Sequence, residues 1–325
     1  MLRARSPINI AIAVVGAALL VVTVQRVGGW SAVVDGIASV GWWFAAVVLL
    51  GAVRMAARAR AWQLCVRATG STPLTFPHAF RALLAGDAAG NLTPLGVLAS
   101  EPTKILMTRL HLSTVTSIAS VAIENAFYMA SVGVVLLAGT WLFLQRADVP
   151  AGLEQISEAI VAIVAIVFAA ALWAARARPA VLSKLAPYIM RLAGRSDAPA
   201  GALRDVESTI YGALKWPALQ TAHVALWEAV FHVGAVAEVW MVLRLLPGGD
   251  RVTIVEAFLL ESAGRFVTIA FKFVPYRLGI DEVGSGAVAG ALGLSPAVGV
   301  TLALVRRLRI LVLNAIGVTI LARRR

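Results

Sequence analysis

Long apolar runs alternate with short polar segments along most of the chain, and this pattern predicts membrane-spanning helices. An α-helix needs about 20 mostly apolar residues to cross the hydrocarbon core of a bilayer. Six runs reach this length, at about 8–27, 42–64, 114–144, 154–175, 217–246 and 296–321. The sequence therefore predicts an all-α, polytopic integral membrane protein with about six full transmembrane helices.

Two further apolar segments, about 76–110 and 252–293, are interrupted by glycine, proline and charged residues. Their features follow one order: an Ala-Phe start, proline, glycine, a polar residue followed by glutamate, and a final Leu-Ser. Proline and glycine interrupt helices, so we expect each segment to form a re-entrant hairpin of two short helices. The residues expected to form the hairpin turns are Asn91, Pro94, Gly96, Pro275 and Gly279.

The shared order of features indicates an internal repeat, although chance similarity or a packing role would also produce it. Three long runs separate the hairpins, so they should enter the membrane from opposite faces, as in inverted-topology repeats. We expect one domain over 1–325, with repeat one at about 8–144 and repeat two at about 154–321. A cytoplasmic amphipathic linker is expected at about 177–215. The substrate site of such proteins lies near the bilayer midplane, between the repeats.

The distribution of lysine and arginine among the short loops predicts the orientation in the membrane. Basic residues gather at the N-terminus, after the second run, within 176–215 and at the C-terminus, whereas the intervening loops hold few. The basic end of the second run comprises Arg54, Arg58, Arg60 and Arg67. Both termini are therefore expected on the cytoplasmic side of the inner membrane.

Composition narrows the possible partners of the chain. Hydrophobic residues make up 60% of the sequence and charged residues 14%, which excludes an ordinary soluble domain. With a net charge of +12, the expected partners are membrane lipids with anionic headgroups rather than nucleic acid. The single cysteine, Cys65, and the four histidines show no metal-ligand spacing, so neither a metal nor a cofactor is expected. Lipid-biosynthesis enzymes are possible further partners, and the oligomeric state is left open.

Three arginines, Arg306, Arg307 and Arg309, lie in the middle of the last apolar run. An uncompensated arginine at the bilayer centre costs about 2.5–3.5 kcal/mol, so these side chains should face the protein interior or water. Glu124 occupies the matching place in repeat one and is the expected partner of one of them. A guanidinium also matches the geometry of phosphate oxygens. Headgroup binding and a structural ion pair are the two interpretations.

Acidic residues begin the second half of each broken segment. Glu101 and Glu282 occupy matched positions, with Lys104 near the first and Asp281 beside the second. Carboxylates stabilise helix N-termini through the helix dipole, and Ser100 or Asp281 is a candidate cap. The alternative interpretation is a pair of related polar sites for a headgroup, a proton or a cation.

Glu228 and His232 lie four residues apart near the centre of the fifth run. A proton relay between them and a hydrogen bond to another helix explain this spacing equally well. Glu238, Glu261 and Arg265 are weaker candidates for the same polar site.

Four stretches resemble the transmembrane-region family of lysylphosphatidylglycerol synthases: RMAARARAW, GNLTPLGVLASEPTK, VPYRLGIDEVGSG and LALVRRLR. The resemblance covers nearly the whole chain and is most specific at 91–101 and 275–286. In the lysyl-lipid synthases this module is joined to a soluble aminoacyl-transferase domain and moves the lipid product between leaflets. Because that domain is missing here, the resemblance implies lipid translocation without lysyl transfer. Similar stand-alone members are associated with hopanoid or glycolipid pathways.

The first hairpin departs from the family pattern. Its spacing between Gly96 and Glu101 is longer than the compact Gly-x-x-Glu of many members, so Glu101 matches the family less closely than Glu282 does.

The expected function is that of a lipid flippase or transporter, which moves an amphipathic lipid through a polar cavity between the repeats. The sequence contains no HExxH, GxSxG or Walker A motif, although intramembrane lipid enzymes often lack such motifs, and we expect a transporter rather than an enzyme. The alternatives are an intramembrane enzyme that modifies a lipid-linked substrate, and a non-catalytic membrane scaffold of a lipid pathway.

Overall fold

The computed structural model describes residues 21–22, 24–25, 29–69, 74–93, 96–145, 151–181, 183–184, 200–247, 249–271, 274 and 277–323. Within these ranges the regular structure is helical, without strands. The first group of helices is α2 (Gly29–Val40), α3 (Phe44–Ala68), α4 (Phe76–Leu92), α5 (Val97–Thr108), α6 (Thr114–Leu144) and α7 (Ala151–Ala177). The second group is α9 (Ala200–Gly212), α10 (Ala218–Leu245), α11 (Ile254–Ala270), α12 (Ile280–Ala291) and α13 (Pro296–Ala322).

The helix lengths confirm an all-α polytopic membrane protein. Val33–Ala68, Thr114–Leu144, Glu154–Ala177 and Ala218–Leu245 are each long and apolar enough to cross a membrane. They match the predicted runs at 42–64, 114–144, 154–175 and 217–246. Helix α13 coincides with the predicted last run, 296–321, although its central arginines lower its hydropathy. Most of the predicted first run, 8–27, and residues 185–199 of the predicted linker lie outside the described residues.

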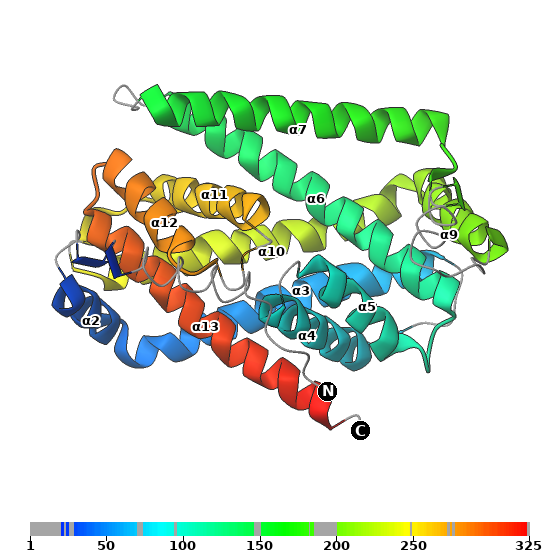
Figure 1. Ribbon diagram of the computed structural model, residues 1–325, viewed down its shortest axis with the longest axis horizontal. Helices are drawn as coiled ribbons and strands as arrows, with labels where there is room; N and C mark the ends of the chain where they lie inside the picture. The colour runs from blue at the N-terminus through cyan, green and yellow to red at the C-terminus, as the bar shows by residue number, and fades with distance from the viewer. Residues whose placement is uncertain are drawn as a thin grey trace.

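Both broken segments form pairs of short helices, as the sequence predicts. Helices α4 and α11 have 17 residues each, and α5 and α12 have 12 residues each. A 12-residue helix is about 18 Å long, too short to cross a hydrocarbon core of about 30 Å. In Figure 1 the α4–α5 pair lies toward the end of the molecule that holds α9, and the α11–α12 pair lies toward the opposite end, near α2.

Glycine forms the turn of each hairpin just before its second helix. Gly279 has a φ of 77°, a conformation that favours glycine, and it caps α12. A Cβ atom at Gly96, which caps α5, would lie 2.6 Å from the carbonyl oxygen of Gly90. The prediction that Ser100 or Asp281 caps these helices is wrong, because both residues lie inside their helices and the glycines occupy the cap position. Pro94 and Pro275 lie outside the described residues.

The helix contacts occur in matched sets. Helix α3 packs on α4, α6 and α13, and α10 packs on α11, α13 and α6. The contact between α4 and α13 corresponds to the contact between α11 and α6. The contact between α5 and α6 corresponds to the contact between α12 and α13. Helices α3 and α10 pack against each other at the centre and run in opposite directions (Figure 1). Exchanging α3–α6 with α10–α13 thus reproduces these contacts.

The close turn at Gly96 generates a stability prediction. We expect Gly96→Val to lower the free energy of unfolding by about 1–3 kcal/mol, because its Cβ would clash with the backbone of Gly90. The control is Gly152→Ala in α7, where a Cβ meets no atom within 4 Å. Thermal unfolding of the purified protein in detergent measures both, and equal melting temperatures for the two variants would contradict the tight turn.

Candidate functional site

One glutamate holds three long helices together in the interior. Glu238 of α10 is fully buried, and its Oε2 accepts hydrogen bonds from Arg54 Nη1 of α3 at 2.7 Å and from Arg309 Nη1 of α13 at 2.6 Å. Charged groups at this depth are stable only when they are paired and hydrogen-bonded. The pairing therefore fixes the register of α3, α10 and α13.

A second buried glutamate extends this network to α11. Glu261 accepts from Arg265 Nε, one turn further along α11, and from Arg306 Nη2 of α13, both at 2.6 Å. Arg306 Nε also lies 3.7 Å from Glu238 Oε1, so the two glutamates share this arginine. The result is a continuous ionic network across four helices.

A third pair connects α3 to α6. Arg58 binds Glu124 with both arms of its guanidinium, with Nε–Oε1 at 2.9 Å and Nη2–Oε2 at 3.0 Å. The same guanidinium lies over the ring of Tyr128, at 4.1 Å from its centroid. The predicted pairing of Glu124 with an arginine of the last run is therefore wrong, because an arginine of α3 lies closer to it.

An aromatic ring gives the arginines a further favourable contact. The guanidinium carbons of Arg54 and Arg265 each lie 4.8 Å from the ring centroid of Phe231 in α10. Cation–π contacts of this kind stabilise desolvated guanidinium groups. Arg265 Nη1 also donates to the Tyr128 hydroxyl at 3.2 Å. These contacts stabilise positive groups that lie close together.

The α11–α12 hairpin contributes a more exposed group of charges. Arg307 Nη2 lies 2.7 Å from Glu282 Oε1 and 3.9 Å from Asp281 Oδ2. Arg277, in the turn before α12, donates to Asp281 Oδ1 at 3.0 Å. Two arginines thus share Asp281, whose side chain is 23% exposed.

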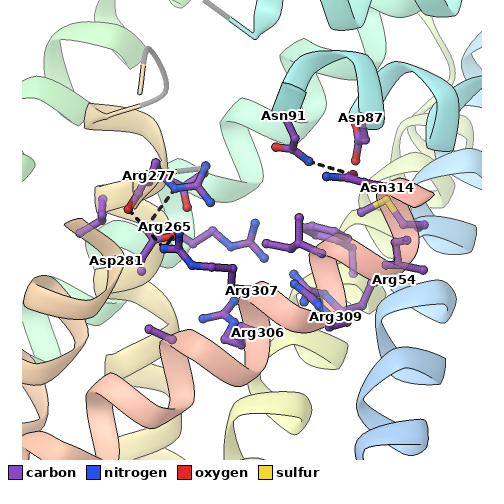
Figure 2. A pocket seen from close by; sticks show the side chains of 18 of the residues that line it. Arg54, Asp87, Asn91, Arg265, Arg277, Asp281, Arg306, Arg307, Arg309 and Asn314 are labelled. Carbon is purple, nitrogen blue, oxygen red and sulfur yellow. Dashed lines mark hydrogen bonds and ion pairs between the residues drawn. The ribbon is translucent and has the colours of Figure 1, made fainter. Parts of the chain in front are cut away.

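These side chains surround a polar cavity of about 200 Å³, large enough for a cluster of water molecules or a phosphate-sized group. Figure 2 shows arginines from α3, α11, α13 and the turn before α12 pointing into one space. The charged residues in its described lining are Arg54, Arg58, Asp87, Arg265, Arg277, Asp281, Arg306, Arg307 and Arg309. Arginines thus outnumber carboxylates at the surface of the cavity, and the paired glutamates lie behind it.

Several donors at this cavity have no hydrogen-bond partner. They include Arg307 Nε and Nη1, Arg309 Nε, Arg54 Nε and Asn314 Nδ2. A buried donor without an acceptor costs about 1–3 kcal/mol. The residues that line the cavity therefore carry unpaired N–H groups of the kind that an anionic ligand with several acceptor oxygens satisfies.

The predicted site residues divide into groups. Asn91, Asp281, Arg306, Arg307 and Arg309 line the polar cavity, and Asn91 Nδ2 donates to Asn314 Oδ1 at 3.2 Å (Figure 2). Glu124 and Glu282 pair with lining arginines. Glu101 and Lys104 pair with each other at 3.1 Å within α5, outside the cavity lining.

The predicted proton pair adopts another arrangement. His232 Nε2 lies 2.9 Å from Ser131 Oγ of α6. Glu228 is fully buried, and neither of its carboxylate oxygens has a hydrogen-bond partner. A relay between the two residues stays a prediction.

The prediction for two of the cavity arginines is wrong. Arg54 and Arg58 are buried in α3 and face the interior, so they do not belong to the basic cytoplasmic end of that helix. Their spacing of four residues inside an apolar run was the available signal, because it places both on one face of a helix. Asp87 and Tyr128 also line the cavity; Asp87 gave a similar signal as a charge inside an apolar segment, whereas Tyr128 gave none.

Comparison with known proteins identifies the family of the chain. The family model described as the lysylphosphatidylglycerol synthase TM region matches residues 8–317. The chain belongs to this family. No curated protein and no solved structure matches it. Membership in the lysylphosphatidylglycerol synthase TM-region family agrees with a multi-pass membrane protein and with a function linked to membrane lipids.

The Arg58–Glu124 pair gives this member of the lysylphosphatidylglycerol synthase TM-region family a testable structural requirement. We expect Glu124→Gln to lower the free energy of unfolding by about 3–5 kcal/mol, because it leaves the buried Arg58 without a counter-charge. The control is Glu158→Gln in α7, which changes an exposed carboxylate and should cost less than about 1 kcal/mol. Denaturant unfolding in mixed micelles measures both. A combined Arg58→Met and Glu124→Leu variant should recover most of the loss, and no recovery would contradict the assigned pairing.

Proposed function

We propose that the protein is a flippase-like transporter that moves an amphipathic lipid with an anionic headgroup between the two leaflets. The polar cavity carries this proposal, because it places an excess of arginines and unsatisfied donors inside a membrane-spanning helical bundle. A lipid headgroup is the group that must cross this depth during translocation. The hydrocarbon chains stay in the apolar surroundings meanwhile.

Arg307 is the proposed first contact of the headgroup. Its Nη2 is paired with Glu282, whereas Nε and Nη1 have no hydrogen-bond partner and the residue lines the cavity. A phosphate accepts two parallel N–H bonds from one guanidinium. Binding would therefore satisfy donors that are costly to leave unpaired.

The carboxylates near Arg307 support release as well as binding. Asp281 and Glu282 compete with a bound phosphate for the same guanidinium. A transporter must bind its cargo weakly enough to release it, and this competition lowers the affinity of the arginine for the headgroup. The neighbouring Arg277–Asp281 pair, at 3.0 Å, supplies an alternative counter-ion when the headgroup displaces a carboxylate.

The matched packing of the helices supports an arrangement as two inverted repeats. The α4–α5 and α11–α12 hairpins have equal helix lengths, and they lie toward opposite ends of the molecule (Figure 1). Each hairpin would then enter from one face of the membrane and border the route to the cavity from that side. Alternating access results when one hairpin opens while the other stays packed.

Transport in vesicles tests the proposed function. In proteoliposomes with the wild-type protein, we expect fluorescent phosphatidylglycerol to move from the inner to the outer leaflet, where external dithionite quenches it. Arg307→Gln should lower the rate of this movement at least tenfold. Arg307→Lys keeps the charge but loses the two-armed bond, so it should give an intermediate rate. Arg251→Gln, which removes an exposed arginine, is the matched control and should behave as wild type. Equal rates for Arg307→Gln and wild type would exclude the proposed role of the cavity, and chemical conversion of the lipid would indicate an enzyme.

The inverted arrangement predicts opposite labelling of the ends of α3 and α10. In a Cys65→Ser background, Arg67→Cys at the end of α3 should react with a membrane-impermeant maleimide only from the cytoplasmic side. Arg251→Cys, after α10, should react only from the other side. Both original side chains are exposed, so access to the reagent is not limited by burial. Labelling of both cysteines from the same side would contradict the inverted repeats.

A further inference from the structure

A second cavity, called the apolar groove here, lies beside the polar cavity between α6, α7, α11 and α12. Its volume is about 240 Å³, and its lining includes Phe143, Ile156, Ile160, Phe266, Val283 and Ala287. Ser262 is one of its few polar residues, and its hydroxyl already donates to the Val135 carbonyl at 3.3 Å. The groove therefore suits a hydrocarbon occupant better than water or a polar ligand.

The α11–α12 hairpin separates the apolar groove from the polar cavity. Arg265 and Ser285 line the polar side, whereas their chain neighbours Phe266 and Gly284 line the apolar side. Val267 borders both spaces. A Cβ at Gly284 would lie 3.1 Å from Val267 Cγ2, so the two helices approach closely at this point. The wall between the groove and the cavity is thus about one side chain thick at Val267.

We propose that the apolar groove holds a hydrocarbon chain of the lipid whose headgroup occupies the polar cavity. This inference rests on the proposed function and adds the part of the site that recognises the chain. The two spaces have complementary chemistry, with charge on one side of the hairpin and apolar side chains on the other. An amphipathic lipid that straddles the hairpin near Val267 matches both sides at once.

The position of the groove gives a lipid chain direct access from the bilayer. Two of its walls, α6 and α7, are helices long and apolar enough to cross the membrane, and the groove lies along the final turns of α6 and the first turns of α7. Ile156 and Val283 line the groove and are 45% and 42% exposed. Helix α7 lies at the outer edge of the bundle, beside α6 (Figure 1). A chain can therefore enter sideways, without passing the arginines.

The groove should contribute orientation more than affinity. A hydrocarbon chain leaves a bilayer that is as apolar as the groove, so its transfer releases little free energy. A groove that fixes the chain nevertheless holds the headgroup near the arginines, which raises its effective concentration in the polar cavity. The expected effect of blocking the groove is therefore a moderate loss of lipid binding, with no loss of headgroup recognition.

A matched pair of tryptophan substitutions tests this inference. Ile156 and Ile163 both lie on α7 and are 45% and 55% exposed, and only Ile156 lines the groove. We expect Ile156→Trp to weaken binding of long-chain phosphatidylglycerol about five- to tenfold in detergent, because the indole fills the groove. Ile163→Trp should leave that binding unchanged. Binding of soluble glycerol phosphate, measured in the same micelles by thermophoresis, should be unchanged in both variants.

Two further variants separate the possible outcomes. Ala287→Trp fills the groove from α12 and should reproduce the effect of Ile156→Trp, with the melting temperature of each variant as the check on folding. Arg307→Gln should weaken binding of both ligands. Suppose that Arg307→Gln weakens binding of both ligands, whereas both groove variants bind the lipid as the wild type does. The groove proposal is then wrong, and the proposed function still stands.

Other results would overturn the proposals separately. Unchanged binding of both ligands in Arg307→Gln contradicts the proposed function itself. A dimer in native mass spectrometry that Ile156→Trp abolishes and Ile163→Trp retains would show that a second copy covers the groove, and the chain proposal would then be wrong. A phosphatidylglycerol with a diazirine at the chain end should crosslink to wild-type α6, α7 or α12 within the groove lining. Crosslinks confined to helix faces outside the groove would contradict it.

Discussion

Neutralisation of charge inside an apolar bundle is the constraint on which this structure depends. Glu238 accepts hydrogen bonds from Arg54 and Arg309 at one oxygen, and it thereby holds α3, α10 and α13 at one level. Glu261 and Glu124 extend the same principle to α11 and α6. None of these groups would be stable alone at hydrocarbon depth. The helices that surround the polar cavity are therefore held in position by the same charged residues that line the cavity or pair with its lining.

The two hairpins share an architecture and differ in chemistry. In the first, Lys104 and Glu101 neutralise each other within one helix, and neither lines the polar cavity. In the second, Asp281 and Glu282 reach across to Arg307 of α13. The α11–α12 hairpin is also polar on one face and apolar on the other, so it separates two environments within a few residues. The second hairpin therefore sets carboxylates against Arg307, whereas the first contributes Asp87 and Asn91 to the lining of the cavity.

The sequence predicted the helices better than it predicted the ion-pair partners of the buried charges. Long apolar runs fix helices by local composition, so α6 and α13 begin and end close to the predicted bounds. The inward orientation of the α13 arginines was predictable, because an unpaired charge that faces the lipid is costly in free energy. Their partners were not, because the sequence offers two groups of arginines for Glu124, and only the packing of α3 against α6 decides for Arg58. Arg54 and Arg58 were misassigned for the same reason, since a basic helix end and a buried basic face have the same local composition.

The shared oxygen of Glu238 also restricts how this protein can evolve. Replacing Glu238 alone leaves the guanidinium groups of Arg54 and Arg309 without their shared carboxylate. Replacing either arginine alone changes the net charge around the carboxylate and the remaining arginine. Tolerated change at these positions must therefore come as compensating substitutions on different helices. Across homologous sequences, the residues at 54, 238 and 309 should covary as one unit, and lineages that have lost the glutamate should have lost an arginine with it.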